Sequence, residues 1–120
     1  MNILIVDDSK AIRCMLLNVL KGAGHEVVEA ANGPEGLAAA EQAKFDLVIT
    51  DVNMPAMDGF EFTRQLRQSQ NYKFAPVIFL TTETDNSFRM KGMEVRATAW
   101  LTKPFSPQKL IDVVAKVGTK

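Results

Sequence analysis

The sequence predicts an α/β fold in which a parallel sheet is covered by helices on both faces. Continuous apolar runs at residues 3–6, 47–49 and 76–80 are typical of strands that are buried on both faces. Stretches with apolar residues at helical spacing follow them. Strand and helix alternate five times with short connections, a pattern that favours parallel strands joined by helices.

Size, charge and cysteine content narrow the class of protein. The 120 residues suit a single domain, 1–120, and 14 basic against 14 acidic residues give no bias toward nucleic acid or an anionic membrane. No apolar run approaches the roughly 20 residues that cross a bilayer, and the first ten residues do not resemble a signal peptide. The single cysteine, Cys14, fits a reducing compartment. We expect a soluble, cytoplasmic monomer that has neither nucleic acid nor a membrane as partner.

Turn and capping residues predict where the elements begin and end. We expect strands near residues 3–6, 25–30, 47–51, 76–80 and 97–101, and helices near 12–22, 33–43, 58–68, 85–95 and 107–117. The expected N-caps are Asp8 or Ser9, Asn32, Asp58, Asp85 and Ser106, and Gly22 or Gly24 should end the first helix. Residues 69–75 are polar and are predicted to connect the third helix to the fourth strand.

Polar side chains follow four of the five expected strands. The first strand delivers Asp7 and Asp8, the third Asp51, the fourth Thr81 and the fifth Lys103. The carboxyl ends of parallel strands share one edge of the sheet, which is where open α/β sheets bind ligands. We therefore expect these five side chains to meet.

Their chemistry suits a metal ion and a phosphoryl group. Crowded carboxylates repel one another and need a cation, and hard oxygen ligands with room for water suit Mg²⁺. Asp51 can act as a nucleophile that forms an aspartyl phosphate, and it needs no general base because a carboxylate is already ionised at neutral pH. Lys103 and the Thr81 hydroxyl can neutralise the oxygens of the transferred group.

Each of these residues also has an ordinary structural explanation when taken singly. Asp51 can be a cap or turn residue, Lys103 a solvated lysine, Thr81 a strand residue, and the Asp7–Asp8 pair a helix cap. Their coincidence at the ends of strands favours the functional interpretation. The only histidine, His25, we interpret as a surface residue beside a turn, and Cys14 as a small apolar helix residue.

The segments VDDS, DVNMPAMDGFE, FLTTE and WLTKPF resemble, in order and spacing, the successive motifs of response-regulator receiver domains. The resemblance covers essentially the whole chain, and TTE with ATAWLTKPFSPQKL is most similar to single-domain CheY-type chemotaxis regulators. It implies a flavodoxin-like, five-stranded parallel sheet of order 2-1-3-4-5 with five alternating helices, the order known for the chemotaxis member.

The same resemblance implies a role for each matching residue. Asp51 would accept the phosphoryl group of a phosphohistidine on a CheA-like histidine kinase. Asp8, Asp51 and the backbone carbonyl of Asn53 would bind Mg²⁺ directly, and Asp7 would act through water.

Further residues would contact the phosphoryl group. Lys103 would pair with it, and its peptide bond to Pro104 is expected to be cis. Thr81 would move toward it, helped by the amides of Thr82 and Asn53.

Trp100 occupies the position of the family's aromatic switch, three residues before Lys103. Rotation of its ring would report the movement of Thr81 to a surface made by the fourth helix, the fifth strand and the fifth helix. The plain alternative is an aromatic strand residue that does not switch.

Two polar positions are expected to set the lifetime of the phosphorylated form. Asn53 and Glu83 lie two residues beyond Asp51 and Thr81, where the family tunes hydrolysis by water. Polar residues at both positions predict a short-lived phosphorylated state.

Two positions depart from the family pattern. Arg96 replaces a glycine that would end the fourth helix with positive φ, so either arginine adopts that costly conformation or the helix ends differently. Thr82 is bulkier than the usual Ala or Gly and could obstruct the phosphate or the Trp100 ring.

The leading hypothesis is a binding module controlled by phosphorylation in chemotaxis or motility. Since no output domain follows Lys120, we expect the signal to leave by contact with a motor or effector protein. One alternative is a receiver that drains phosphate from the kinase without a target, and another is a receiver that is never phosphorylated. A Mg²⁺-dependent phosphatase with an aspartyl-phosphate intermediate is disfavoured, because Asn53 stands where a second acid is usual. A flavodoxin-like cofactor carrier lacks its phosphate loop after the first strand.

Overall fold

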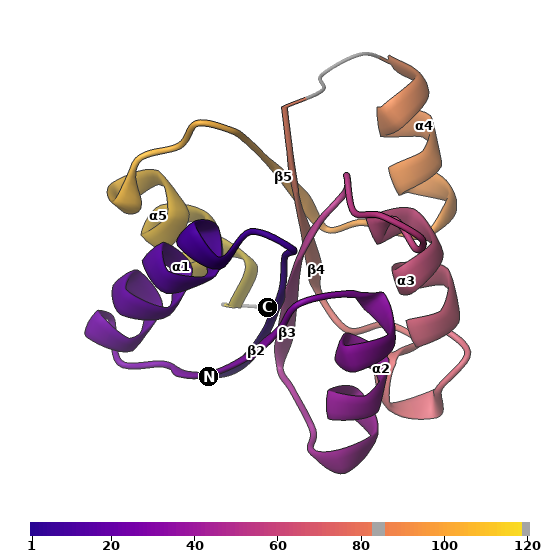
Figure 1. Ribbon diagram of the computed structural model, residues 1–120, viewed down its shortest axis with the longest axis horizontal. Coiled ribbons are helices and arrows are strands. Elements are labelled where there is room, and N and C mark those ends of the chain that lie inside the picture. The colour runs from indigo at the N-terminus through magenta and orange to yellow at the C-terminus, as the bar shows by residue number, and fades with distance from the viewer. Residues whose placement is uncertain (83–85, 119–120) are drawn as a thin grey trace.

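The computed structural model describes residues 1–82 and 86–118, and these form an alternating α/β structure (Figure 1). The described strands are β1 (Asn2–Val6), β2 (Glu26–Ala30), β3 (Leu47–Asp51), β4 (Val77–Thr81) and β5 (Ala99–Thr102). The described helices are α1 (Lys10–Gly22), α2 (Gly33–Gln42), α3 (Gly59–Leu66), the 3₁₀ turn η1 (Gln70–Tyr72), α4 (Asn86–Glu94) and α5 (Pro107–Gly118). The described strands are all parallel, in the order β2-β1-β3-β4-β5, which confirms the predicted fold class and strand order.

Helices cover both faces of the sheet, so the core has two layers. Figure 1 shows α1 and α5 on one side of the sheet and α2, α3 and α4 on the other. Successive strand residues point to opposite faces: Ile3 and Ile5 pack with α1 and α5, whereas Leu4 and Val6 pack in the other layer. Strands buried on both faces explain the continuous apolar runs in the sequence.

Side-chain caps fix the helix starts where the sequence predicted them. The cap oxygens of Ser9, Asn32, Asp58 and Ser106 accept hydrogen bonds from backbone amides three residues later, at 3.3, 2.9, 2.8 and 3.1 Å respectively. The expected cap at Asp85 lies outside the described residues. After α1, Gly24 rather than Gly22 adopts a positive φ, of 95°.

Residues 69–75 connect α3 to β4, as predicted. They contain η1, whose Tyr72 is 2% exposed. The Tyr72 hydroxyl lies 2.9 Å from the Ala40 carbonyl oxygen and 2.8 Å from that of Ala43, and it accepts a hydrogen bond from the Phe45 amide. One aromatic side chain therefore anchors a segment that is otherwise polar.

Strand β5 starts two residues later than predicted. The Ala97 amide donates instead to the Gly92 carbonyl at 2.8 Å, which closes the end of α4. The Thr98 hydroxyl accepts from the Val77 amide at 3.0 Å. These two residues therefore complete a turn before the strand pairing begins.

Arg96 adopts the left-handed conformation, with φ of 62°, so the first of the two alternatives is correct. The Arg67 guanidinium holds this turn from α3. It donates to the carbonyls of Val95 (3.1 Å) and Arg96 (2.9 Å), and also to those of Tyr72 (2.8 Å) and Ala75 (2.6 Å). One side chain thereby ties the end of α4 to the connection between α3 and β4.

Two minor predictions have different outcomes. Cys14 is in α1 as expected, yet it is exposed rather than packed as an apolar residue. His25 is half-buried beside the turn after α1, and its Nδ1 lies 3.1 Å from the amino group of Met1. Burial and then this ammonium group lower the pKa of His25.

Among the helices that the structure describes, none has the length and apolar character needed to cross a bilayer.

Candidate functional site

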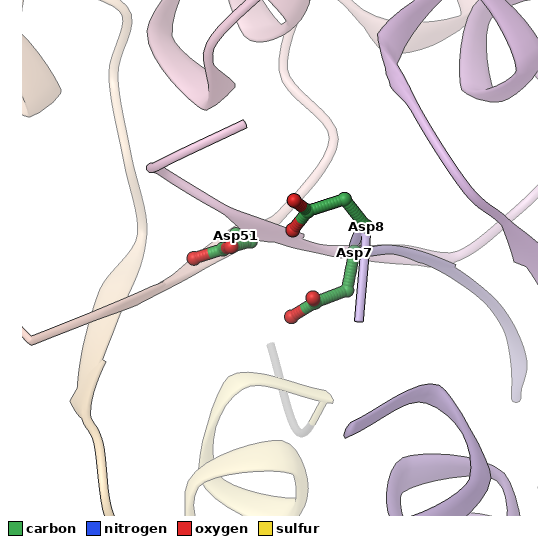
Figure 2. A group of neighbouring side chains, drawn as sticks. All are labelled: Asp7, Asp8 and Asp51. Carbon is green, nitrogen blue, oxygen red and sulfur yellow. The ribbon is translucent and has the colours of Figure 1, made fainter. Parts of the chain in front are cut away.

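Three carboxylates gather where β1 and β3 end. Asp7 and Asp8 follow the last residue of β1, and Asp51 is the last residue of β3. One oxygen from each carboxylate lies within 4.8 Å of the other two. Figure 2 shows Asp7 and Asp8 leaving the chain next to each other and opening, with Asp51, onto one common space. Asp7 and Asp51 are buried and Asp8 is exposed, so the cluster has a closed base and an open side.

Lys103 approaches this cluster from the end of β5. Its Nζ lies 3.2 Å from Asp51 Oδ1 and 3.4 Å from Asp7 Oδ2. Its backbone amide donates to the Thr81 carbonyl at 2.9 Å, which places it beside the end of β4. The Lys103–Pro104 peptide bond is cis, as expected.

The electrostatics of Asp51 are dominated by burial. Desolvation raises the pKa of Asp51, and the neighbouring charge of Asp7 raises it further. The Lys103 ammonium and a hydrogen bond from the Asn53 amide lower it, but they do not compensate fully. One ammonium group therefore does not balance the crowded carboxylates.

The cluster fits a small divalent cation. It offers hard oxygen ligands within a few ångströms, an excess of negative charge, and an open side at Asp8 where water or phosphate oxygens can complete the coordination. Mg²⁺ prefers this combination of one or two carboxylates with retained water.

The other predicted site residues lie at the same edge. Thr81 is the buried last residue of β4, exposed Thr82 follows it, and exposed Asn53 lies two residues beyond Asp51. In the sheet, Asp51 pairs with Leu80, the residue before Thr81, and Thr81 pairs with Thr102, the residue before Lys103. Asp51, Thr81 and Lys103 therefore lie within about one residue of one another along the strand direction. Glu83 lies outside the described residues.

Trp100 faces the layer of α2, α3 and α4 rather than the carboxylates. Its half-buried ring packs edge-on against Phe79, with centroids 5.2 Å apart, and is 6.1 Å from the Phe60 ring. Both rings belong to the buried core of that layer. Trp100 is thus linked to the site through β4 and α3, not by direct contact with the acids.

Sequence reasoning missed Arg13. Its guanidinium donates to the Asp7 carbonyl at 2.6 Å and pairs with Glu29 at 2.9 Å, so it holds the backbone from which two of the carboxylates project. The only signal was a basic residue near the start of a helix, where the helix dipole disfavours a cation unless it has a specific partner.

The fold and the acid cluster define a receiver domain of the two-component phosphorelay class. The model of the response regulator receiver domain matches residues 3–115, and the chain belongs to this family. The chain is 38% identical over 115 residues to the protein PilH of Pseudomonas aeruginosa, covering 96% of this chain and 95% of PilH. It spans 44% of the length of two other curated relatives, the transcriptional regulatory proteins PhoP and ResD of Bacillus subtilis, to which it is 40% and 37% identical over 90% and 91% of this chain.

Solved structures agree with this assignment. The chemotaxis protein CheY4 of Vibrio cholerae is 48% identical and superposes with a TM-score of 0.95, with 97% of each chain covered. The receiver domain of the sensor histidine kinase PA1611 of Pseudomonas aeruginosa is 25% identical with a TM-score of 0.90, covering 99% of this chain and 98% of that one. That structure is described as having a magnesium ion coordinated in the active site cleft.

Proposed function

We propose that Asp51 accepts a phosphoryl group from the phosphohistidine of a CheA-like sensor histidine kinase, and that this modification switches a protein-binding surface in chemotaxis or motility control. The family accepts phosphoryl groups from histidine kinases. The observation that carries the proposal is the Asp51 carboxylate, buried at the end of β3 with an ammonium group 3.2 Å away and two further carboxylates beside it. Residues 1–120 would act as one receiver domain in the cytoplasm.

The chemistry follows from the positions of the side chains. An Asp51 oxygen attacks phosphorus, the bond from phosphorus to the histidine nitrogen breaks, and its electron pair returns to the imidazole ring. Lys103 neutralises a phosphoryl oxygen from its position beside Asp51, and the Thr81 hydroxyl donates to another after moving toward it. The amides of Asn53 and Thr82 are the remaining donors.

The proposed ligands of Mg²⁺ are Asp8, Asp51 and the Asn53 carbonyl, with Asp7 acting through water. When bound, the ion offsets negative charge on the phosphoryl oxygens. The magnesium described in the active site cleft of the PA1611 receiver domain supports a magnesium site, and the oxygens of Asp7, Asp8 and Asp51 within 4.8 Å of one another support its place here.

Two residues beyond the acceptor, Asn53 would tune the hydrolysis of the phosphorylated form, together with Glu83. Asn53 is exposed two residues beyond Asp51, where a hydrolytic water would approach the phosphoryl group. Asn53→Ala should change the hydrolysis rate of the phosphorylated protein, followed by intact mass, more than its phosphorylation rate. Equal changes in both rates would contradict this role.

The output of the switch would pass from Thr81 through Trp100 to the surface of α4, β5 and α5. The similarity to the chemotaxis protein CheY4 supports a role in chemotaxis, for which we propose a motor or other effector protein as the partner. A receiver that only drains phosphate from the kinase would be phosphorylated in the same way, yet it would capture no partner in its phosphorylated form.

The decisive test is incubation with acetyl phosphate and Mg²⁺, followed by intact mass. We expect one phosphoryl group on the wild type and none on Asp51→Asn. Asp112→Asn is the matched control, because Asp112 is exposed on α5 and accepts a hydrogen bond from Gln108. Phosphorylation of Asp51→Asn would refute the assignment of the acceptor. Fast turnover of many unrelated phosphoesters would favour the phosphatase instead.

A further inference from the structure

The Trp100 ring occupies a tight space between the core and α4. Phe79 and Phe60 pack against it from the sheet and from α3. Gly92 of α4 contacts it as well: a Cβ added to Gly92 would fall well under 3.0 Å from Cζ2 of the ring, and 3.1 and 3.2 Å from Cε2 and Cη2. Real Cβ atoms essentially never approach another atom that closely. The ring in this position and any side chain at residue 92 therefore exclude each other.

Gly92 is also the point where this part of α4 meets the core. Among residues 89–94, Gly92 is buried and the other five are exposed, with Met90 at 65% and Met93 at 75%. Within residues 89–94, contact with the core therefore depends on what fills the space beside Gly92, which is the indole ring of Trp100. Lys91 adds a weaker contact, with Nζ 5.9 Å from the centre of the Phe60 ring.

Glycine inside a helix is otherwise unfavourable, because alanine costs less backbone entropy. Gly22 at the end of α1 provides a comparison, since a Cβ there would meet nothing within 4 Å. The steric reason for glycine thus exists at residue 92 and is absent at residue 22.

We propose that Gly92 is a positioning residue that seats the Trp100 ring on α4, and that this seat couples α4 to the state of Asp51. The second half rests on the proposed function. In the sheet, Trp100 pairs with Phe79, and Phe79 lies two residues before Thr81 in β4. A displacement of the end of β4 changes the packing of Phe79 on the ring, and the ring transmits it to the one buried position of residues 89–94.

Thermal unfolding of single and double variants tests whether Gly92 positions the Trp100 ring. We expect Gly22→Ala to raise the Tm, as alanine normally does in a helix, and Gly92→Ala to lower it. In a Trp100→Tyr background the smaller ring frees the space, so Gly92→Ala should no longer lower the Tm. A rise in Tm for Gly92→Ala in the wild-type background, equal to that of Gly22→Ala, would overturn the proposal.

Tryptophan fluorescence of the full chain tests the coupling between α4 and the state of Asp51, because Trp100 is the only tryptophan in the sequence. With acetyl phosphate and Mg²⁺, we expect Gly92→Ala to gain phosphate in intact mass as the wild type does. Its emission should already differ before phosphorylation, and the change on phosphorylation should be smaller. An emission response equal to that of the wild type would refute the coupling. If the wild type gained no phosphate, the proposed function would fail, while the thermal comparison would still decide the seat.

Discussion

The burial and crowding of the Asp51 carboxylate lower the stability of the folded protein. The same features prepare the site to bind a cation and a phosphoryl group. The carboxylate is buried beside Asp7, and Lys103 offsets only part of the penalty. Active sites commonly hold such groups, because the same crowding that destabilises the free protein favours a cation and a phosphoryl group.

Asp51→Asn should therefore stabilise the metal-free protein at neutral pH. The pKa of Asp51 is raised in the folded state, so above about pH 4, where the unfolded chain loses this proton, the folded protein still binds it. The free energy of unfolding of the wild type consequently falls as pH rises through the window between the two pKa values. We expect Asp51→Asn to be more stable than the wild type at pH 7 in EDTA.

Urea unfolding at pH 7 and below pH 4 measures this difference, which should disappear at the lower pH. Asp112→Asn controls for the loss of one carboxylate from the exposed surface. A wild type more stable than Asp51→Asn at pH 7 would show that the pairing with Lys103 outweighs burial.

Arg96 stores backbone strain at the end of α4. Arg96 has a φ of 62°, a conformation that costs a non-glycine residue about 1–2 kcal/mol. Glycine avoids this strain, but it loses more conformational entropy on folding, so the net gain in stability is smaller than the strain. We expect Arg96→Gly to raise the free energy of unfolding by about 0.5–1 kcal/mol. Arg96→Ala keeps the strain and loses the contact 5.3 Å from the Phe74 ring, so it should not stabilise. A gain in both variants would point to a cause other than the backbone.

At the scale of elements, Arg67 joins parts of the chain that local sequence does not connect. It donates to four carbonyls, two in the connection from η1 to β4 and two at the end of α4. Desolvation lowers the pKa of Arg67, with Arg96 adding to the effect, but arginine stays charged in proteins. The clamp therefore holds the strained turn at Arg96 in place.

Arg67→Met should destabilise the protein by roughly 3 kcal/mol, because hydrogen bonds from a charged donor are worth about 1.5–3 kcal/mol each but are not additive. Arg67→Lys should recover only part of this, since an ammonium group lacks the planar fork that reaches both segments. Urea denaturation measures both variants. Arg64→Met is the control, as Arg64 pairs on the exposed face of α3 with Glu61. A loss below about 0.5 kcal/mol for Arg67→Met would mean that water replaces the guanidinium.

The sequence predicted elements and site residues where the cause was local or shared by the family. Ser9, Asn32 and Asp58 act within their own helical turn, so their pattern was sufficient. The gathering of Asp7 with Asp51 followed from strand ends in a parallel sheet. Arg67 was missed because it donates to backbone carbonyls, which leave no trace in residue types. Arg13 was missed because one of its partners is the Asp7 carbonyl and the other, Glu29, lies 16 residues away in β2. The start of β5 was also missed, because it depends on the hydrogen bond from the Ala97 amide to the Gly92 carbonyl that closes the end of α4.

At the scale of the whole molecule, the net charge of zero hides a local excess of negative charge at one edge of the sheet. Binding of Mg²⁺ there should stabilise the folded state by mass action. At a free concentration 100 times Kd, the free energy of unfolding should rise by about 2.7 kcal/mol. We expect Asp8→Asn to lose most of this gain, and because Asp8 is exposed the substitution spares the core.

Thermal unfolding with increasing MgCl₂ gives the comparison, with Asp112→Asn as a variant that should respond like the wild type. KCl at matched ionic strength separates binding from screening. An equal Mg²⁺ response in Asp8→Asn and wild type would remove Asp8 from the ligand set.

The two-layered core leaves the single indole on one side of the sheet only, with α2, α3 and α4. Tryptophan emission therefore follows the loss of packing in that half, whereas far-ultraviolet circular dichroism averages over the helices of both halves. If the shared sheet makes the two layers unfold as one cooperative unit, the denaturation curves from tryptophan emission and from circular dichroism will superimpose. A midpoint at lower denaturant by emission would show that the layer of α2, α3 and α4 unfolds before that of α1 and α5.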